Sequence, residues 1–524
     1  MDEATTADRP LLAGRFWIGA LAGARAIRIA TLVLLGGGMC AAIFLRLWEL
    51  NGIGYNSDEA VYAGQGAALA NDPELTPFFP VFRAHPLLFQ TILSIGYRLG
   101  GGDLMGRSLS AAFGFGTIVL VFLIGRLLYG KAAGLIAALL IALMPYDVLV
   151  SRQVLLDGPM TFFSTLALYL VALYATTLRR PWLYAAGAAM GLTILTKETS
   201  VLAVGALFAF FALSPEVKTR TRDLCFAALA MIGVALAYPL ALRFGGGGER
   251  GQNYLVWQLL RRPNHEWSFY PTNVPLAIGP LVIAAALAGL WLLRRQMSWR
   301  ETLFLCWILV PAVFFQLWPV KGFQYLLPAA PPVALLAGRT LALWRPSPKL
   351  FGRIVPSAAI SLTLVALVAS SIAFETWDRI QPASGGTFLA GSGGIPGGRE
   401  MGHWVRANTP EGSEFLAVGP SMANLVSFYG HRKGYGISVG TNPARRNPAY
   451  EPIGNPDLAI RRNDLQYIVW DAYSASRTPF FSAKLLTYVR KYNGRAVHTE
   501  HVDATTKGGR STKRPVITVY EVHR

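Results

Sequence analysis

Long apolar stretches fill the first 375 or so residues of this chain and dictate its fold class. Eleven of them approach the roughly 20 apolar residues that a helix needs to cross a bilayer. They lie at approximately 29–48, 108–126, 132–149, 159–178, 182–197, 199–214, 224–243, 274–293, 301–319, 323–343 and 354–374. Because the bilayer core holds no water to satisfy open backbone groups, each stretch is predicted to be a helix. With 53% hydrophobic and 15% charged residues and a mean hydropathy of +0.39, the chain is predicted to be an α-helical polytopic membrane protein of about eleven spans.

A further apolar stretch, at 85–99, is predicted to lie along the outer membrane surface instead of crossing the membrane. If it were a span, Arg126 and Lys131 would lie outside and Asp157 inside. That arrangement reverses the excess of Lys and Arg that cytoplasmic loops carry. We therefore expect an interfacial helix at this position.

The ionisable residues at the ends of the spans fall into two chemically different sets. With a cytoplasmic N-terminus, the inner set is basic, as the positive-inside rule requires. It comprises Arg126, Lys131, Arg179, Arg180, Lys218, Arg220, Arg222, Arg294, Arg295, Arg300, Arg345, Lys349 and Arg353. The outer set mixes acids, bases and imidazoles and comprises Asp58, Glu59, His85, Arg152, Asp157, Lys197, His265, Glu266 and Lys321. This mixed set predicts an extracytoplasmic active site in a multi-pass protein of the cell membrane.

Four parts are predicted along the chain. Residues 1–28 are expected to form a cytoplasmic tail, 29–374 a transmembrane domain with outer loops at 51–107 and 244–273, 375–398 a glycine-rich linker, and 399–524 an extracytoplasmic soluble α/β domain. Within the last part we expect helices at 399–408, 422–429 and 481–492, and strands at 414–418, 465–470 and 515–522. Short strands that alternate with helices are typical of a small α/β layer domain.

The net charge of +19 has two interpretations, attraction to anionic lipid headgroups or recognition of a phosphorylated substrate. Nucleic acid is disfavoured as a partner because much of this charge lies in short loops between spans. Cys40, Cys225 and Cys306 all lie in apolar segments without disulfide or metal-ligand spacing. We interpret them as small core residues.

The strongest local motif, Gly54-Tyr-Asn-Ser-Asp-Glu-Ala-Val-Tyr62, directly follows the first span. Two adjacent carboxylates, Asp58 and Glu59, are costly to desolvate at a membrane boundary, so they are candidate functional residues. A structural interpretation is equally open, in which Ser57 or Asp58 caps a helix whose first turn carries Glu59. Both can hold at once, because an aspartate fixed at the head of a helix is well placed to accept a proton or to hold a cation.

Two further motifs place candidate binding residues near Asp58. His85 and Pro86 open the predicted interfacial helix in the sequence Arg83-Ala-His85-Pro86, where a structural histidine and a ligand remain alternatives. Arg152 and Asp157 lie at the turn between the third and fourth spans. They form either an ion pair that closes the turn or a guanidinium fork for a phosphate.

Lys197 and Lys321 place cations at the outer ends of spans. Lys197 either extends its alkyl chain toward the interface or binds a phosphate, and the adjacent Glu198 favours a placed charge. Lys321 and Tyr325 precede prolines that are expected to kink the tenth span and free backbone groups.

In the second outer loop, His265 and Glu266 belong to an aromatic segment that follows the glycines at 245–248. This segment is interpreted as an interfacial aromatic belt in preference to a lid that binds the acceptor.

Taken in this order and spacing, the motifs resemble those of GT-C fold glycosyltransferases. The resemblance is strongest to the superfamily of protein O-mannosyltransferases and of bacterial transferases that add aminoarabinose to lipid A. It covers roughly residues 29–345 and rests on the loop of Asp58, the His85-Pro86 helix, the turn at 151–157, the Thr196-Lys197 end and the stretch 321–332. Many relatives carry Lys or His before a Pro-Pro pair, whereas this chain has Pro86-Leu87.

What the resemblance implies is a polyprenyl-phosphate sugar donor and a protein, lipid or glycan acceptor, used on the outer face of the membrane. By position, Asp58 with Glu59 beside it matches the acidic residue that acts as base or orients the acceptor, and Asp157 matches the second acidic site. Lys197 and Lys321 match basic positions near the donor phosphate. His85, Arg152 and Tyr325 join them as expected donor-binding residues.

The chemistry of such a transfer agrees with these residue types. A phosphate leaving group needs cations or a metal beside it, and the acceptor needs a carboxylate. A single displacement with inversion of the sugar is the expected course. No cofactor is firmly implied, and a divalent cation (Mg or Mn) held by Asp58 and Asp157, with Glu59 and His85 nearby, stays open because no compact metal motif is present.

Two alternatives come from other functional classes. One is a flippase or transporter for lipid-linked sugars, which would need charges near the bilayer middle, whereas these charges lie at span ends on one side. The other is a non-catalytic assembly subunit, against which the retention of both acidic sites argues. Within the enzyme class, transfer of an oligosaccharide or a phospho-group is the alternative to transfer of one sugar.

Overall fold

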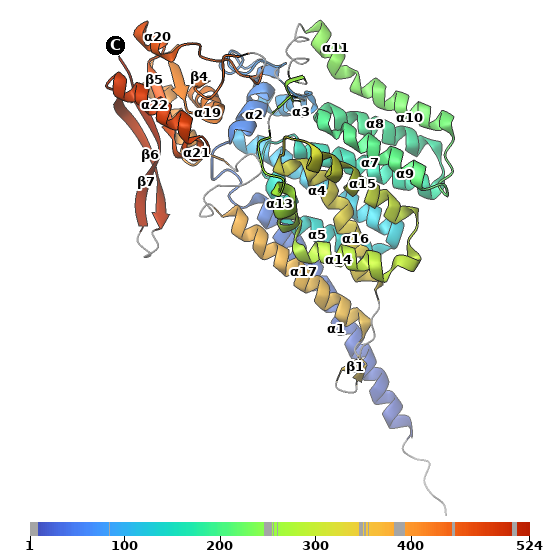
Figure 1. Cartoon of the computed structure of the whole chain (residues 1–524). Helices are drawn as coiled ribbons and strands as arrows, with labels where there is room; N and C mark the ends of the chain where they lie inside the picture. Colours follow the sequence, from blue (N-terminus) through green and yellow to red (C-terminus); the bar gives the residue numbers. More distant parts are fainter. Residues whose placement is uncertain are drawn as a thin grey trace, which may run out of the picture.

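The computed structural model describes residues 9–82, 84–245, 254, 256–258, 260–261, 263–344, 349–350, 353–354, 356–381, 394–442, 446–505 and 511–523. The molecule has two parts, a long helical bundle and a smaller C-terminal unit of strands and helices that covers one end of it (Figure 1). Here the bundle means the elements up to residue 381, and the C-terminal unit means residues 394–523.

The bundle follows the apolar pattern of the sequence. Its helices are α1 (Arg9–Leu47), α2 (Ser57–Leu69), α3 (Leu88–Arg98), α4 (Asp103–Tyr129), α5 (Lys131–Leu143), α6 (Pro145–Ser151), α7 (Asp157–Thr177), α8 (Arg180–Thr196), α9 (Leu202–Leu213), α10 (Thr221–Ala235), α11 (Ala237–Phe244), α13 (Phe269–Ile278), α14 (Pro280–Leu292), α15 (Trp299–Leu317), α16 (Ala330–Leu343) and α17 (Ser357–Ile380). The described part of the bundle also has three 3₁₀ helices, η1 (Glu198–Val201), η2 (Arg294–Gln296) and η3 (Phe323–Ala329), and two paired antiparallel strands, β1 (Lys349–Leu350) and β2 (Arg353–Ile354).

Each of the eleven predicted stretches coincides with one or two of these helices. Among the described residues, seven helices are long and apolar enough to cross a membrane, or up to nine if each of two bent pairs counts as one span. The segments of α8 and of η1 with α9 are shorter. The chain is therefore a multi-pass membrane protein. The helix α3 spans only 11 residues, in agreement with the prediction that 85–99 does not cross the membrane.

Proline and glycine account for the two bends. The helices α5 and α6 meet at 58° where Pro145, which has no N–H to donate, ends the first of them. A bend of 91° separates α13 from α14 at Gly279, whose φ of +102° suits glycine, and Pro280 opens the next helix. The helix before this bend, α13, contributes Phe269 to the cavity described below.

The two predicted boundaries at the ends of the bundle fall inside helices. The helix α1 already begins at Arg9, so most of the predicted tail 1–28 is helical, and residues 1–8 lie outside the described residues. The helix α17 continues to Ile380, so the predicted linker 375–398 begins inside a helix, and its glycine-rich part, 382–393, lies outside the described residues.

The C-terminal unit is built on a five-stranded sheet of order β4-β3-β5-β7-β6. The strands are β3 (Glu414–Ala417), β4 (Lys433–Gly436), β5 (Tyr467–Asp471), β6 (Arg495–Thr505) and β7 (Ser511–Glu521), and the helices are α18 (Gly398–Asn408), α19 (Pro420–Gly430), α20 (Pro456–Arg461), α21 (Ala472–Arg477) and α22 (Pro479–Lys491). The strands β4, β3 and β5 are parallel, and β7 and β6 join them antiparallel.

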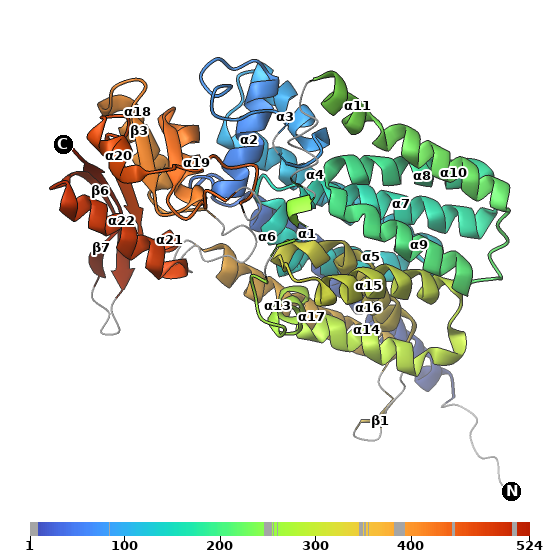
Figure 2. The ribbon, with the colours of Figure 1, turned by 45° about the horizontal axis from the view of Figure 1, so that its top comes forward.

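All three predicted strands and all three predicted helices of this unit are present, while β4, β6, α20 and α21 were not predicted. The long β6 and β7 form a hairpin that extends beyond the rest of the sheet (Figure 2). Since β6 is an edge strand, it carries many polar residues and lacks the apolar pattern by which central strands are recognised.

The C-terminal unit rests on the bundle mainly through α19, which packs against α2. The buried phenol of Tyr429 accepts a hydrogen bond from the backbone N–H of Tyr55 and donates one to the carboxylate of Asp103. Arg399 donates to the backbone and side chain of Asn51. Both parts therefore meet around the short loop that leads into α2.

Candidate functional site

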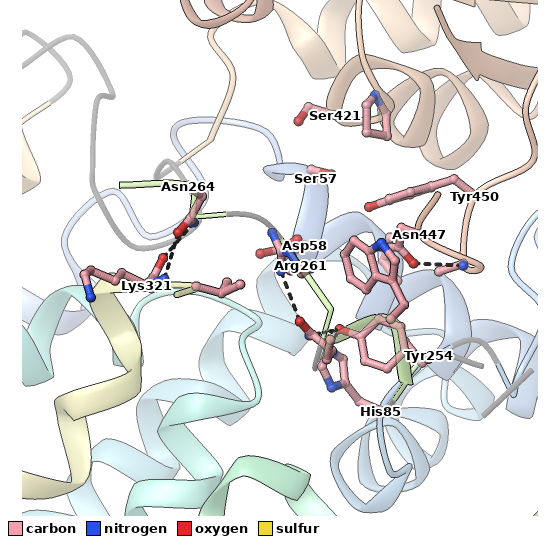
Figure 3. A pocket seen from close by; sticks show the side chains of 18 of the residues that line it. Ser57, Asp58, His85, Tyr254, Arg261, Asn264, Lys321, Ser421, Asn447 and Tyr450 are labelled. Atoms are coloured by element: carbon pink, nitrogen blue, oxygen red, sulfur yellow. Dashed lines mark hydrogen bonds between the residues drawn. The ribbon is translucent and has the colours of Figure 1, made fainter. Parts of the chain in front are cut away.

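A cavity of about 740 Å³ lies where the bundle meets the C-terminal unit (Figure 3). From the bundle, its walls include Asp58, His85, Lys197, Arg261, Lys321 and Tyr325. From the C-terminal unit, they include Ser421, Arg446, Asn447, Tyr450, Tyr473 and Arg477. Residues that are far apart in the sequence thus share one chamber.

Asp58 lies in the first turn of α2 and lines the cavity. The cap of this helix is Asn56, which corrects the prediction of Ser57 or Asp58 as the cap. The side-chain oxygen of Asn56 accepts hydrogen bonds from the N–H groups of Asp58 and Glu59, at 2.9 and 3.0 Å. Because the cap is supplied by another residue, the carboxylate of Asp58 is left without a hydrogen bond among the described residues, and burial raises its pKa.

Glu59 is fully buried and does not line the cavity. Its carboxylate accepts hydrogen bonds from Arg107, at 2.8 and 2.9 Å, from the N–H of Val154 at 3.0 Å and from the N–H of Asn56 at 3.0 Å. These contacts tie the loop before α2 to α4 and to the turn before α7. Glu59 is therefore an anchor of the loop, which corrects the prediction that it is a catalytic carboxylate.

Asp157 and Lys197 form a buried ion pair. The Nζ atom of Lys197 lies 2.7 Å from Oδ1 and 2.9 Å from Oδ2 of Asp157, and both side chains are at most 5% exposed. The ammonium also lies 4.7 Å from the centre of the Tyr325 ring. Lys197 lines the cavity with Asp157 behind it. Lys197 is therefore a placed charge and not a side chain extended to the interface.

His85 lies between an acid and a phenol at the cavity wall. Its Nδ1 is 2.9 Å from Oε2 of Glu198, and its Nε2 is 3.2 Å from the hydroxyl of Tyr254. Gln258 donates a further hydrogen bond, of 2.6 Å, to that hydroxyl. The adjacent Arg83 lies outside the described residues. Both ring nitrogens of His85 thus have partners, which fixes the imidazole at the cavity wall.

Arg152 does not reach the cavity. Its guanidinium donates to the backbone carbonyls of Leu45 and Trp48, both at 2.8 Å, at the end of α1. Burial lowers the pKa of Arg152 to about 10. Neither predicted role of Arg152 is found, because Asp157 pairs with Lys197 and the guanidinium closes the end of α1.

Lys321 and Tyr325 both line the cavity, but in different ways. The ammonium of Lys321 donates to the carbonyls of Gln316 and Trp318, at 2.9 and 3.1 Å. It thus satisfies open carbonyls at the end of α15, which is a position that favours a cation. The ammonium of Lys321 is therefore already hydrogen-bonded, which disfavours its predicted contact with the donor phosphate. Tyr325 lies at the cavity wall beside Lys197.

In the second outer loop, only one of the two predicted lid residues, His265 and Glu266, lies at the cavity. His265 lines the cavity and stacks on Phe269, with ring centres 4.1 Å apart. Glu266 is exposed and does not line the cavity. The loop is pinned where Asn264 exchanges two hydrogen bonds of 2.8 Å with the backbone of Lys321. Residues 246–253 lie outside the described residues.

Several wall residues were missed by the sequence analysis. Tyr254 and Arg261 lie in the second outer loop, between its glycines and the segment of His265 and Glu266 that was interpreted as an aromatic belt. The guanidinium of Arg261 lies 4.5 Å from the centre of the Trp257 ring and has no acidic partner in the described part of the chain. The available signal was that Arg261 closely follows the aromatic residues Tyr254 and Trp257 in the sequence. The wall supplied by the C-terminal unit had no such signal.

The candidate metal ligands do not form a metal site in the described residues, where no three His, Cys, Asp or Glu side chains are grouped to hold an ion. Asp157 is bound to Lys197, Glu59 to Arg107 and His85 to Glu198. Among these candidates only Asp58 lacks a partner in the described residues, and one free carboxylate does not fit the Mg or Mn site that the sequence left open.

The family model of dolichyl-phosphate-mannose-protein mannosyltransferases matches residues 84–242. The chain is 28% identical to an undecaprenyl phosphate-α-4-amino-4-deoxy-L-arabinose arabinosyl transferase 1 of Pseudomonas fluorescens over 49% of either chain. It spans about half the length of the curated relatives that it matches.

Several solved structures match nearly the whole chain, and two of them are described below. ArnT from Cupriavidus metallidurans bound to undecaprenyl phosphate has a TM-score of 0.65 and 15% identity, over 93% of this chain and 97% of that one. The oligosaccharyltransferase AglB from Archaeoglobus fulgidus, in complex with an inhibitory peptide and a dolichol-phosphate, has a TM-score of 0.55 and 15% identity, over 92% and 74%. The chain therefore has the GT-C fold of membrane glycosyltransferases, as the motifs predicted.

Proposed function

We propose that this protein is a glycosyltransferase that moves a sugar from a polyprenyl-phosphate donor to a protein, lipid or glycan acceptor on the outer face of the membrane. One observation carries the proposal. Asp58 presents a carboxylate without a hydrogen-bond partner, among the described residues, to a cavity whose bundle wall also carries Lys197 and Arg261. A base and a set of cations in one chamber are what transfer from a phosphate-linked sugar requires.

In the proposed reaction, Lys197, Arg261 and His85 face the phosphate of the donor. The ammonium of Lys197 is held in place by Asp157, so its position is fixed before the donor binds. Because Lys197 is buried, its ammonium stabilises the charge of the departing phosphate more strongly than it would in bulk solvent. Tyr325, beside Lys197, offers a phenolic hydrogen bond to the same group.

Asp58 is assigned the acceptor side. An acceptor hydroxyl attacks the anomeric carbon, and Asp58 takes the hydroxyl proton as the new bond forms. The bond between the anomeric carbon and the phosphate oxygen breaks, and the polyprenyl phosphate leaves with the electron pair. A single displacement of this kind inverts the anomeric configuration. A product that retains the configuration of the donor would contradict this course.

The outer face is assigned from the charges at the two ends of the bundle. Basic residues lie at the end of α4 and at the starts of α5 and α8, namely Arg126, Lys131, Arg179 and Arg180. Cytoplasmic loops carry this excess of basic residues. The cavity, at the other ends of these helices, would then be extracytoplasmic. The same placement disfavours a transporter, whose charges are expected near the bilayer middle.

The test is transfer from a panel of radiolabelled polyprenyl-phosphate sugars into membrane fractions. Wild type is compared with Asp58→Asn and with Asp464→Asn, a control of identical chemistry at an exposed aspartate of the C-terminal unit. Loss of a general base is expected to reduce transfer by about 10²- to 10⁴-fold. Transfer that is equal in all three proteins would exclude Asp58 as the base, and no transfer from any donor would exclude the proposed activity.

A further inference from the structure

The wall that the C-terminal unit adds to the cavity has its own chemistry. It comes from the start of α19, from residues 438–440 and 446–450 and from α21, and it includes Asn447, Tyr450 and Tyr473. In Figure 3, Asn447 and Tyr450 lie on the side of the cavity away from Lys321 and Asn264. Aromatic rings interleaved with amide and hydroxyl groups are suited to the alternating apolar faces and hydroxyl edges of a sugar.

Two arginines give this wall a positive charge. Arg446 and Arg477 both line the cavity, and neither has an ion pair with an acidic side chain in the ranges that the structure describes. Arg477 donates to the hydroxyl of Tyr473, and its guanidinium lies 5.2 Å from the centre of that ring. The Nε of Arg446 is shielded from water and has no hydrogen-bond partner among the described residues. A guanidinium held in this way is suited to bind an anion.

The charge of the whole chamber indicates a second anion besides the donor. Asp58 is the only acidic side chain among the residues that the structure places in its lining. On the bundle wall, the cations Lys197 and Arg261 suffice for the single phosphate of the donor. The arginines of the C-terminal unit come from the opposite part of the molecule and would otherwise leave their charge uncompensated in a half-enclosed cavity.

We propose, building on the proposed glycosyltransferase function, that this wall is the acceptor subsite and that the acceptor is an anionic carbohydrate. Its carboxylate or phosphate pairs with Arg446 and Arg477, and Tyr450 and Tyr473 pack on its sugar rings. This places an acceptor hydroxyl between the wall and Asp58. A peptide bound by strand addition would need an open strand edge, whereas this wall consists of helix and loop side chains.

The test is binding of the purified full-length protein to oligosaccharides that end in glucose, in glucuronate or in glucose 6-phosphate. Wild type is compared with the double variant Arg446→Gln/Arg477→Gln. The matched control is Arg462→Gln/Arg490→Gln, which removes two exposed charges from the same unit outside the cavity. Binding of undecaprenyl phosphate and the melting temperature are measured for all three proteins.

Wild type and the control are expected to bind a glucuronate or a phosphate end at least tenfold more tightly than glucose. The double variant is expected to lose this preference and to keep its affinity for undecaprenyl phosphate. The two anionic arms identify which group is bound. Equal binding of neutral and anionic ends by wild type would overturn the inference, as would loss of undecaprenyl phosphate binding in the double variant, which would assign the arginines to the donor.

Failure of this inference and failure of the proposed function are distinguishable. If no donor supports transfer but anionic ends are preferred as described, the glycosyltransferase proposal falls and the carbohydrate site stands. If transfer occurs without any preference for anionic ends, the inference about the acceptor falls alone.

Discussion

The side-chain amide of Asn424 in α19 donates a hydrogen bond of 2.9 Å to the hydroxyl of Ser57, the residue directly before Asp58. A residue of the C-terminal unit thus holds the first turn of the helix that presents the candidate base. The phenol of Tyr429, one turn further along α19, holds the backbone of Tyr55 in the same loop. The C-terminal unit therefore has a positioning role for Asp58 besides lining the cavity.

This relationship predicts that Asn424→Ala lowers the turnover of the enzyme. A neutral hydrogen bond contributes about 0.5 to 1.5 kcal/mol, so a decrease of about three- to tenfold in kcat is expected if the bond holds Asp58 in its reactive position. Donor affinity should not change, because the phosphate-facing residues belong to other elements. Asn408→Ala in the neighbouring α18 is the control, since Asn408 is exposed and bonds only within its helix. An unchanged kcat in Asn424→Ala would contradict the positioning role.

The buried pair of Lys197 and Asp157 allows stability to be separated from function. Lys197→Met leaves a buried carboxylate without its partner, which costs about 3 to 5 kcal/mol. The double variant Lys197→Met/Asp157→Asn removes both charges and is expected to recover most of the melting temperature. Transfer should remain lost in both variants, because the cation that faces the donor phosphate is absent. A stable double variant that still transfers sugar would show that Lys197 serves the fold alone.

The pKa of Asp58 predicts the acid limb of the pH–rate profile. Burial raises this pKa, so the carboxylate takes up a proton at a higher pH than an ordinary aspartate, whose pKa is about 3.9. A base is inactive when protonated, and kcat/KM should therefore fall as the pH decreases through the raised pKa. Lys197 and His85 lower the pKa of Asp58, whereas the charge of Asp157 raises it. Lys197 must be retained in this experiment because of its role at the phosphate.

The variant His85→Gln tests whether the acid limb of the pH–rate profile comes from Asp58 or from the imidazole of His85. If the limb belongs to Asp58, it should persist in His85→Gln and move to a higher pH, because a nearby positive charge has been removed. It should be absent from the residual activity of Asp58→Asn. A limb that disappears in His85→Gln would assign it to the histidine.

Transfer is expected to need no added divalent cation. In the proposed reaction Lys197, Arg261 and His85 face the leaving phosphate, and the described residues hold no group of three metal-ligating side chains. Activity in excess EDTA should therefore stay within about twofold of activity with Mg²⁺ or Mn²⁺, an effect of less than about 0.5 kcal/mol on the barrier. A loss that is restored by adding back one metal would contradict this expectation.

The sequence predicted the membrane part well because its signal is local. Apolar length alone identifies the helices, and the stretch 85–99, which the rule for basic loops kept from being predicted as a span, contains a helix of only 11 residues. It also placed Asp58, His85, Lys197 and Tyr325 at one end of the bundle, where they share a cavity.

What the sequence could not predict depends on partners that are distant along the chain. The partner of Asp157 is 40 residues away along the chain and that of Glu59 is 48 residues away. The sequence therefore does not distinguish these two paired carboxylates from the unpaired carboxylate of Asp58. Arg152 was misassigned for this reason, since nearby Asp157 appeared to be its natural partner. The contribution of the C-terminal unit was also hidden, because polar residues in loops carry no periodic signal.

Asp471 predicts a pH dependence of stability in the C-terminal unit. It is fully buried at the end of β5, where one carboxylate oxygen accepts a hydrogen bond of 2.6 Å from the N–H of Ser474. The other oxygen has no hydrogen-bond partner within the described residues. Burial raises the pKa of Asp471 to about 6. The folded state therefore binds this proton more tightly than the unfolded state does, whose pKa is about 3.9.

The ionised carboxylate should thus cost stability above pH 6, by about 3 kcal/mol for a shift of about two units, and the cost should vanish as the pH falls below about 4. Asp471→Asn keeps an oxygen for the N–H of Ser474 and removes the charge. Its C-terminal unit should be more stable than that of wild type at about pH 7.5, and the difference should shrink to zero at about pH 4. Hydrogen exchange of the β5 amides in the full-length protein measures this, with Asp464→Asn as the exposed control. An increase in stability that is independent of pH would assign the effect to packing, because only titration of Asp471 makes it disappear in acid.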